Sequence, residues 1–146
     1  MNRFVLVFLT IGPVSSLAGC GEVHERVLTP TVIADPHKFN RISAQLSEDD
    51  RGLLMEYAVV HRIAQREPKL APPIFSEGPH TVTRALDISR QMKAIDEACQ
   101  KTLSPIGTRI AEAMTATTRD DALLDALNKT HHEASVACKR QRWAVK

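Results

Sequence analysis

Two apolar stripes in the second half of the chain, each carrying one cysteine, constrain its fold more than any other feature. The first recurs at steps of four, three, four and four residues, and consists of Ile88, Met92, Ile95, Cys99 and Leu103. The second recurs at steps of three, four, three and four, and consists of Leu124, Leu127, His131, Ala134 and Cys138. Such steps place side chains on one face of an α-helix. The pattern therefore predicts two long helices, whose cysteines can face each other where the helices pack.

Capping residues and prolines set the expected limits of these helices. Thr81 or Thr83 can cap the first helix, because either hydroxyl can accept a hydrogen bond from a backbone amide of the first turn. Leu103-Ser104-Pro105 should end or kink this helix and start another, because proline lacks the amide hydrogen that a helix interior needs. Thr118 is the expected cap of the last helix.

A further long helix is predicted before these two. Ser47 precedes three acidic residues, which suit the positive end of a helix, and Pro68 should stop the helix near Arg66. Its apolar residues recur at helical spacing, and its expected buried face consists of Leu53, Leu54, Tyr57, Val60, Ile63 and Ala64. A shorter helix is expected over residues 36–45.

The proline-rich residues 67–80 connect this helix to the long pair. Their prolines and Gly78 exclude regular structure, and Ile74 and Phe75 are expected to be tucked against the core. The segment is either a stiff link between helices or a recognition loop, since loops often carry function.

The predicted fold is all-α, because alanine is common and β-branched residues do not alternate over any long stretch. We expect four or five helices in a small bundle, forming a single domain over residues 36–146. Residues 20–35 are expected to be a flexible tether, because Pro30 and the adjacent Pro36 resist helix there. The apolar residues of that segment can alternatively pack on the domain or form a short edge strand; they are Val27, Leu28, Val32 and Ile33.

An export signal precedes this body. Arg3 supplies positive charge, and residues 4–11 form an apolar core that is too short to cross a bilayer. Gly12-Pro13 then breaks the apolar run, and Leu17-Ala18-Gly19-Cys20 follows. This combination resembles the signal peptide and lipobox of bacterial lipoproteins.

The resemblance implies a defined modification and location. The thiol of Cys20 would receive a diacylglycerol, the signal peptide 1–19 would be removed, and the new amino terminus would be acylated. Two or more fatty chains, such as palmitate, make a lasting anchor. Because Gly21 and no aspartate follows the cysteine, the resemblance favours the outer membrane, with the body facing the periplasm.

The resemblance also bears on the other two cysteines of the chain. If lipid consumes Cys20, then Cys99 and Cys138 remain as a pair. Exported chains meet an oxidising compartment, where such a pair usually forms a disulfide. The alternative is two separate buried thiols that act as small apolar side chains.

Composition and motifs argue against several functions. The formal charge of +2 gives no field that would attract nucleic acid, and few aromatic residues remain to stack sugars or bases. Nucleophile motifs and phosphate-binding loops are not found in the sequence. A metal-dependent or enzymatic role would use His131 and His132, but adjacent residues on a helix diverge by about 100°. We therefore expect no enzyme, no cofactor and no metal.

The basic C-terminus is the remaining candidate for a contact surface. It contains Lys139, Arg140 and Arg142 beside Trp143, the only tryptophan. Cations suit the end of a helix, but the group also suits a partner protein or anionic lipid. The sequence favours a lipid-anchored envelope protein that binds another envelope protein, as an accessory of secretion or conjugation, an exclusion or immunity factor, or an inhibitor. The alternative is a structural lipoprotein whose basic end meets membrane or cell wall.

Overall fold

The computed structural model describes the backbone of residues 19–118 and 120–146, and the side chains of residues 22–118 and 120–146. The signal peptide expected over residues 1–19 therefore lies almost wholly outside the described residues, as does the side chain of Cys20. The α-helices are α1 (Gly19–His24), α2 (Pro30–Ala34), α3 (Pro36–Ser43), α4 (Glu48–Arg66), α5 (Val82–Thr115) and α6 (Asp121–Trp143). Two 3-10 turns, η1 (Pro68–Leu70) and η2 (Pro73–Ser76), and two short strands, β1 (Val27–Leu28) and β2 (His80–Thr81), complete the described structure. The predicted all-α class is confirmed.

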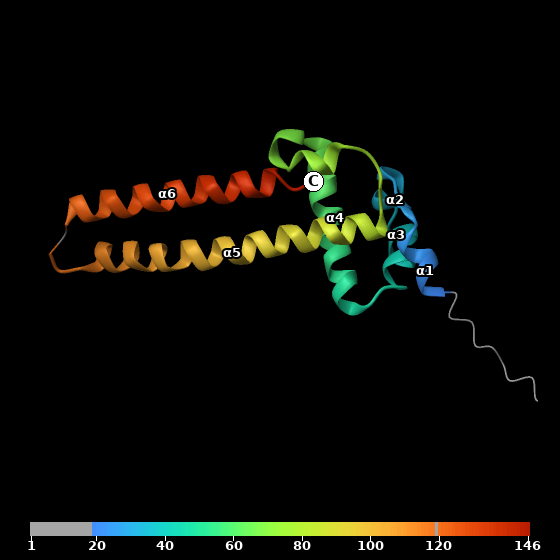
Figure 1. The fold of residues 1–146 in the computed structure, drawn as a ribbon, viewed down its shortest axis with the longest axis horizontal. Coiled ribbons are helices and arrows are strands. Elements are labelled where there is room, and N and C mark those ends of the chain that lie inside the picture. The colour runs from blue at the N-terminus through green and yellow to red at the C-terminus, as the bar shows by residue number, and fades with distance from the viewer. Residues whose placement is uncertain (1–18, 119) are drawn as a thin grey trace, which may run out of the picture.

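The helices form a compact body and a projecting arm. Helices α5 and α6 run antiparallel as a long hairpin, while α1 to α4 gather around the first half of α5 (Figure 1). Helix α4 crosses α5 inside this body, and the C-terminus returns beside α4 (Figure 1). With 34 residues, α5 is about 50 Å long. The arm therefore carries its tip far from the body.

Side-chain caps start the three long helices. Ser47 accepts a hydrogen bond from the amide of Asp50 at 3.2 Å, and Thr81 accepts one from the amide of Arg84 at 3.2 Å. For α6 the prediction of Thr118 was wrong, because Asp120 is the cap and accepts from the amide of Leu123 at 3.0 Å. A carboxylate is a strong acceptor at the positive end of a helix, which accounts for the difference.

Helix α5 does not end at Pro105. The expected break lies inside a continuous helix, where Pro105 cannot donate the usual amide hydrogen bond. Two local features accompany it: α6 packs along this part of α5, and the hydroxyl of Thr108 donates to the carbonyl of Ser104 at 3.1 Å. Contact with a neighbouring helix commonly outweighs local propensity, so the two predicted helices are one.

Most of the core lies in the body. The largest fully buried side chains are Tyr57, Phe75, Leu28, Leu54, Leu86, Ile88, His61, Val23 and Val82. Ile74 and Phe75 are buried, as the sequence predicts for the connector. In α6, by contrast, the buried residues are Leu124 and Leu127. The arm is therefore a two-helix layer with little core of its own.

Residues 22–35 differ from the expected tether. Strand β1 pairs antiparallel with β2, with Val27 opposite Thr81 and Leu28 opposite His80. The side chains of Val23, Leu28 and Ile33 are buried in the core. Prolines do not prevent this packing, because Pro30 occupies the first turn of α2, where its missing amide hydrogen costs nothing. The alternative, in which this segment packs on the domain as an edge strand, describes the observed arrangement.

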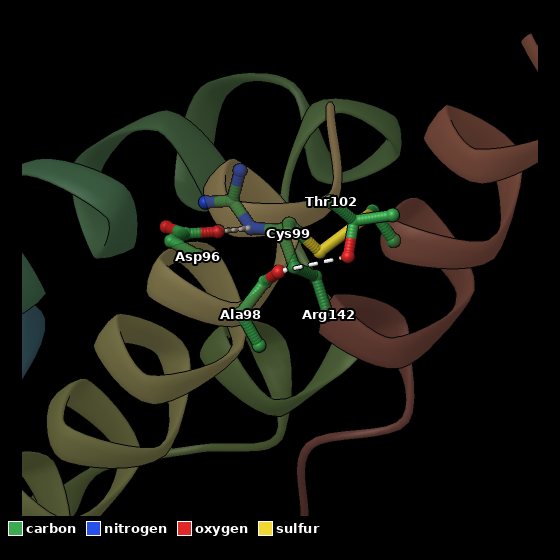
Figure 2. Close-up of a disulfide and its surroundings, with 6 residues drawn as sticks. Asp96, Ala98, Cys99, Thr102 and Arg142 are labelled. Atoms are coloured by element: carbon green, nitrogen blue, oxygen red, sulfur yellow. Dashed lines mark hydrogen bonds and ion pairs between the residues drawn. A yellow bond between two sulfur atoms is a disulfide. The ribbon is translucent and has the colours of Figure 1, made fainter. Parts of the chain in front are cut away.

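Cys99 and Cys138 form the predicted disulfide, with their Cα atoms 5.8 Å apart. It joins α5 to α6 at the level of the body (Figure 2). Within the described residues, no helix is both long enough and apolar enough to cross a membrane.

We predict that opening the disulfide lowers the free energy of unfolding by up to about 4 kcal/mol, because the bond closes a loop with a sequence separation of 39. Thermal and urea unfolding of the oxidised protein should be compared with the reduced protein and with a Cys99→Ser/Cys138→Ser double variant. The double variant should match the reduced protein. Equal stability of all three would show that the bond contributes nothing.

Candidate functional site

Helix α4 is apolar on two faces. Its inner face buries Leu54, Tyr57, Ala58, His61 and Ala64, whereas Leu53 and Val60 are half-buried at its flank. Its outer face exposes Met55 by 45%, Val59 by 48% and Ile63 by 42%. These three residues, the apolar stripe, follow each other at steps of four, so they lie in one row along the helix. The prediction that Ile63 is buried was wrong, and Met55 and Val59 were not anticipated.

A groove runs beside the apolar stripe, between α4 and the hairpin. Its central hollow has a volume of about 720 Å³ and is lined by Met55, Val59 and Val60 of α4 and by Met92 of α5, with Tyr57 and Phe75 at its inner edge. Charged side chains complete its lining: Glu56, Lys93, Asp96, Glu97 and Arg142. Methionine side chains adapt to different apolar shapes, which suits a surface that receives a partner.

Two further hollows adjoin the central one. The basic hollow, of about 600 Å³, lies at the C-terminal end of α4 and includes Ile63, Leu70 and Trp143. The acidic hollow, of about 540 Å³, lies at the N-terminal end of α4 and includes Glu48 and Asp49. Each shares lining residues with the central hollow, so the three form one continuous groove, here called the α4 groove.

Opposite charges gather at the two ends of the α4 groove. The acidic hollow is lined by four acidic and two basic residues: Glu48, Asp49, Glu56, Glu97, Arg90 and Lys93. The basic hollow is lined by three basic residues and one acidic residue: Lys69, Lys139, Arg142 and Asp96. The groove is therefore polarised along α4, with an apolar middle.

The end of α6 forms one wall of this groove. The guanidinium Nε of Arg142 lies 3.3 Å from a carboxylate oxygen of Asp96 on α5, next to the disulfide (Figure 2). Arg142 and Asp96 line both the central and the basic hollow. Val145, beyond the helix, is buried in the core. The C-terminus is thus fixed to the body at two points.

The structure brings together most of the basic residues that the sequence singled out. Lys139, Arg142 and Trp143 line the basic hollow, while Arg140 lies on another side of α6. The connector takes part as well, since Lys69, Leu70 and Pro72 line the same hollow and Leu70 is 66% exposed. This arrangement is consistent with a recognition role for the 67–80 segment.

The histidine pair of α6 lies apart from the α4 groove. His131 is half-buried and His132 is exposed. Across residues 19–118 and 120–146, no group of three or more His, Cys, Asp or Glu side chains is placed to hold a metal ion. His132 lines a small separate hollow on the outer side of α6 with Glu133 and Arg140.

The apolar stripe could have been found from the sequence. Between residues 53 and 64, apolar residues cover more of the α4 helix than one buried face can use. A surface helix normally keeps its apolar residues to a single stripe. The surplus residues, Met55 and Val59, are the signal of a second contact face.

A cluster of the buried Tyr57 and His61 and the half-buried His80 lies on the inner side of the groove. The phenol oxygen of Tyr57 lies 2.7 Å from Nδ1 of His80, and the Tyr57 ring packs against Phe75 with centroids 5.3 Å apart. Burial raises the pKa of Tyr57 to about 12. Burial, with the nearby His80, lowers the pKa of His61, and burial and Arg84 lower that of His80. The cluster is therefore most stable with both imidazoles neutral.

No protein-family model matches this chain, and neither a curated protein nor a solved structure matches it significantly.

We predict that acid destabilises the protein through His61. The pKa of this group is lower in the folded protein than its ordinary value of 6.5, so the unfolded chain binds the proton more tightly. The stability it contributes is complete above pH 6.5 and is lost as the pH falls from there through the folded pKa. Urea unfolding at about pH 8 and about pH 5 should show this loss. A His61→Gln variant should lose less stability over the same interval, and an identical loss in both proteins would contradict the assignment.

Proposed function

We propose that this chain is a lipid-anchored protein of the bacterial envelope that binds protein through the α4 groove. The observation that carries the binding role is the apolar stripe, where Met55, Val59 and Ile63 are each more than 40% exposed beside an apolar hollow. Exposed apolar surface of this kind, rimmed by charge, marks interaction sites. The anchor is supported by the apolar N-terminal core and the Leu17-Ala18-Gly19-Cys20 lipobox.

The arrangement of the C-terminus favours protein over membrane as the contact. Arg142 is paired with Asp96, Trp143 is half-buried in the groove wall, and Val145 is buried. A basic tail that binds anionic lipid would present its cations and its tryptophan together to the bilayer. Here Lys139, Arg142 and Trp143 instead line one end of a polarised groove.

The proposed role is non-enzymatic. A lipid anchor confines the body to one membrane surface, which raises its effective concentration near other envelope proteins. Such confinement suits an accessory protein of secretion or conjugation, an exclusion or immunity factor, or an inhibitor of an envelope enzyme. The expected location is the outer membrane, with the body in the periplasm.

We predict that Cys20→Ala abolishes fatty-acid labelling of the protein in bacterial cells and leaves the uncleaved precursor. Cys20 is the only cysteine of the lipobox, so no other thiol can accept the diacylglycerol there. The Cys99→Ser/Cys138→Ser double variant is the matched control and should be labelled normally. Normal labelling of Cys20→Ala would rule out the anchor.

We predict that a photo-crosslinking residue at Val59 captures protein in the envelope, because Val59 lies at the middle of the apolar stripe. The control places the photo-crosslinking residue at Glu112, which is exposed on the arm, and should not give that crosslinked product.

With the crosslinker moved to Met55, Val59→Asp should lower the yield tenfold or more. Val59 is 48% exposed, so this change should alter the free energy of unfolding by less than about 1 kcal/mol. Gln65→Asp adds the same charge at an exposed position of α4 that lies off the stripe, and should leave the yield unchanged. Absence of any crosslinked product from Val59 would exclude binding through this groove.

A further inference from the structure

The α4 groove places its charges in an order that a second α4 helix would match. Along α4 the acidic hollow comes first, the apolar stripe follows and the basic hollow comes last. A helix that lies antiparallel to α4 must therefore present cations at the acidic hollow and acids at the basic hollow. Its middle must present apolar side chains to the stripe.

Helix α4 itself meets these three requirements. Its first turn carries the exposed acids Glu48 and Asp49, and its last turn carries Arg66. Asp50 of the same turn is paired with Arg90 of its own chain. The exposed middle of α4 is the apolar stripe. When two copies lie antiparallel about a two-fold axis beside Val59, the first turn of each α4 meets the end of the other. Met55 of one copy then faces Ile63 of the other, because both are four residues from Val59.

The hollows of two such copies also complement each other. Ile63 lines the same hollow as Lys139 and Arg142. Ile63 of the first copy faces Met55 of the second. The basic hollow of the first copy therefore lies next to Glu56 of the second copy, which lines the acidic hollow of that copy. A two-fold axis repeats the contact, so the basic hollow of each copy lies beside the acidic hollow of the other. Such self-complementarity is the requirement for a closed symmetric dimer.

Gly52 offers space for the close approach that this pairing needs. It lies on the exposed side of α4, lines the acidic hollow, and has no atom within 4 Å of the place where a Cβ would stand. Glycine inside an exposed helix costs roughly 1 kcal/mol relative to alanine, and no contact within the chain accounts for it here. In the antiparallel pair, Gly52 and Arg66 are both seven residues from Val59, so the long side chain of Arg66 passes over the glycine of the other copy.

We propose that the protein bound at the α4 groove is a second copy of this chain, and that the two copies are joined by antiparallel packing of their α4 helices around Val59. The proposal rests on the proposed function, because it names the protein that the groove binds. A second copy supplies the required order of acidic, apolar and basic groups from residues of this chain alone, so no other partner is needed to account for the groove.

The test is a cysteine crosslink at the axis. In the full chain, purified in detergent, Val59→Cys should form a disulfide-linked dimer under mild oxidation, because the two residues 59 face each other. Gln65→Cys, exposed on the same helix but off the stripe, should stay monomeric. The unmodified chain, treated alongside, accounts for any linkage through Cys20. A monomeric Val59→Cys, or equal linkage from both positions, overturns the proposal.

A charge swap provides a second test, because crosslinking by random collision would not depend on the signs of the charges in the two hollows. Glu56→Lys should reduce the Val59→Cys dimer about tenfold, since it places like charges against the basic hollow of the other copy. Lys139→Glu should reduce it similarly, and the double variant should restore it. Failure of the double variant to recover overturns the antiparallel arrangement.

The outcomes separate this proposal from the proposed function. If the photo-crosslinker at Val59 captures a different protein and no second copy, the groove binds protein but the dimer is wrong. If that crosslinker captures nothing and the detergent protein binds anionic vesicles through the groove, both proposals fail.

Discussion

The bond between Cys99 and Cys138 determines much of what the rest of the molecule can do. Helix α6 has few buried side chains, so apolar packing alone holds it weakly against α5. The disulfide fixes the two helices together at the level of the body, and the ion pair of Arg142 with Asp96 lies beside it (Figure 2). With α6 held there, Trp143 forms the wall of a groove and Val145 reaches the core. Without that restraint, this wall of the groove would depend on the packing of α6 along α5, on the Arg142–Asp96 ion pair and on the burial of Val145.

Helix α4 contributes one face to the buried core of the body and another to its exposed surface. Its inner face holds Tyr57 between Phe75 and His80, and this packing fixes the position of the connector. The hydroxyl of Ser89 on α5 donates to the carbonyl of Leu53 at 3.0 Å, which sets α5 against α4. The outer face is consequently presented as a rigid row of apolar side chains. A rigid, preformed surface loses little conformational entropy when a partner binds.

Much of this fold follows from local sequence. Helical spacing and caps predict α4 almost to the residue, because Ser47 and Pro68 act through contacts within a few residues. The facing of Cys99 and Cys138 follows from the stripes that carry them. The continuity of α5 through Pro105 and the packing of residues 22–35 were not predictable in the same way. Both depend on distant contacts, with α6 in one case and with β2 in the other.

The candidate site also contains residues that the sequence indicates and residues that only the structure reveals. The basic residues Lys139 and Arg142 and the single Trp143 are conspicuous in the sequence, and the structure gathers them at one end of the groove. Nothing local shows that these residues meet α4, because the two segments are brought together only by the return of the hairpin. Met55 and Val59 were missed for another reason. The apolar residues of α4 exceed what one buried face can use, and this excess is visible in the sequence. Which of them stay exposed depends on where α5 and the connector pack against α4, and local sequence does not show that.

The burial of Val23 has a consequence for how an acylated chain would stand at a membrane. Val23 is only 1% exposed and follows the lipobox cysteine by three residues, a span of at most about 11 Å. Fatty chains on Cys20 would hold the body directly against the lipid headgroups, with no slack between them. Helix α1 and the tip of the arm lie at opposite ends of the long axis (Figure 1). The hairpin would then project away from the bilayer, and its tip would be the part of the described chain farthest from the membrane surface.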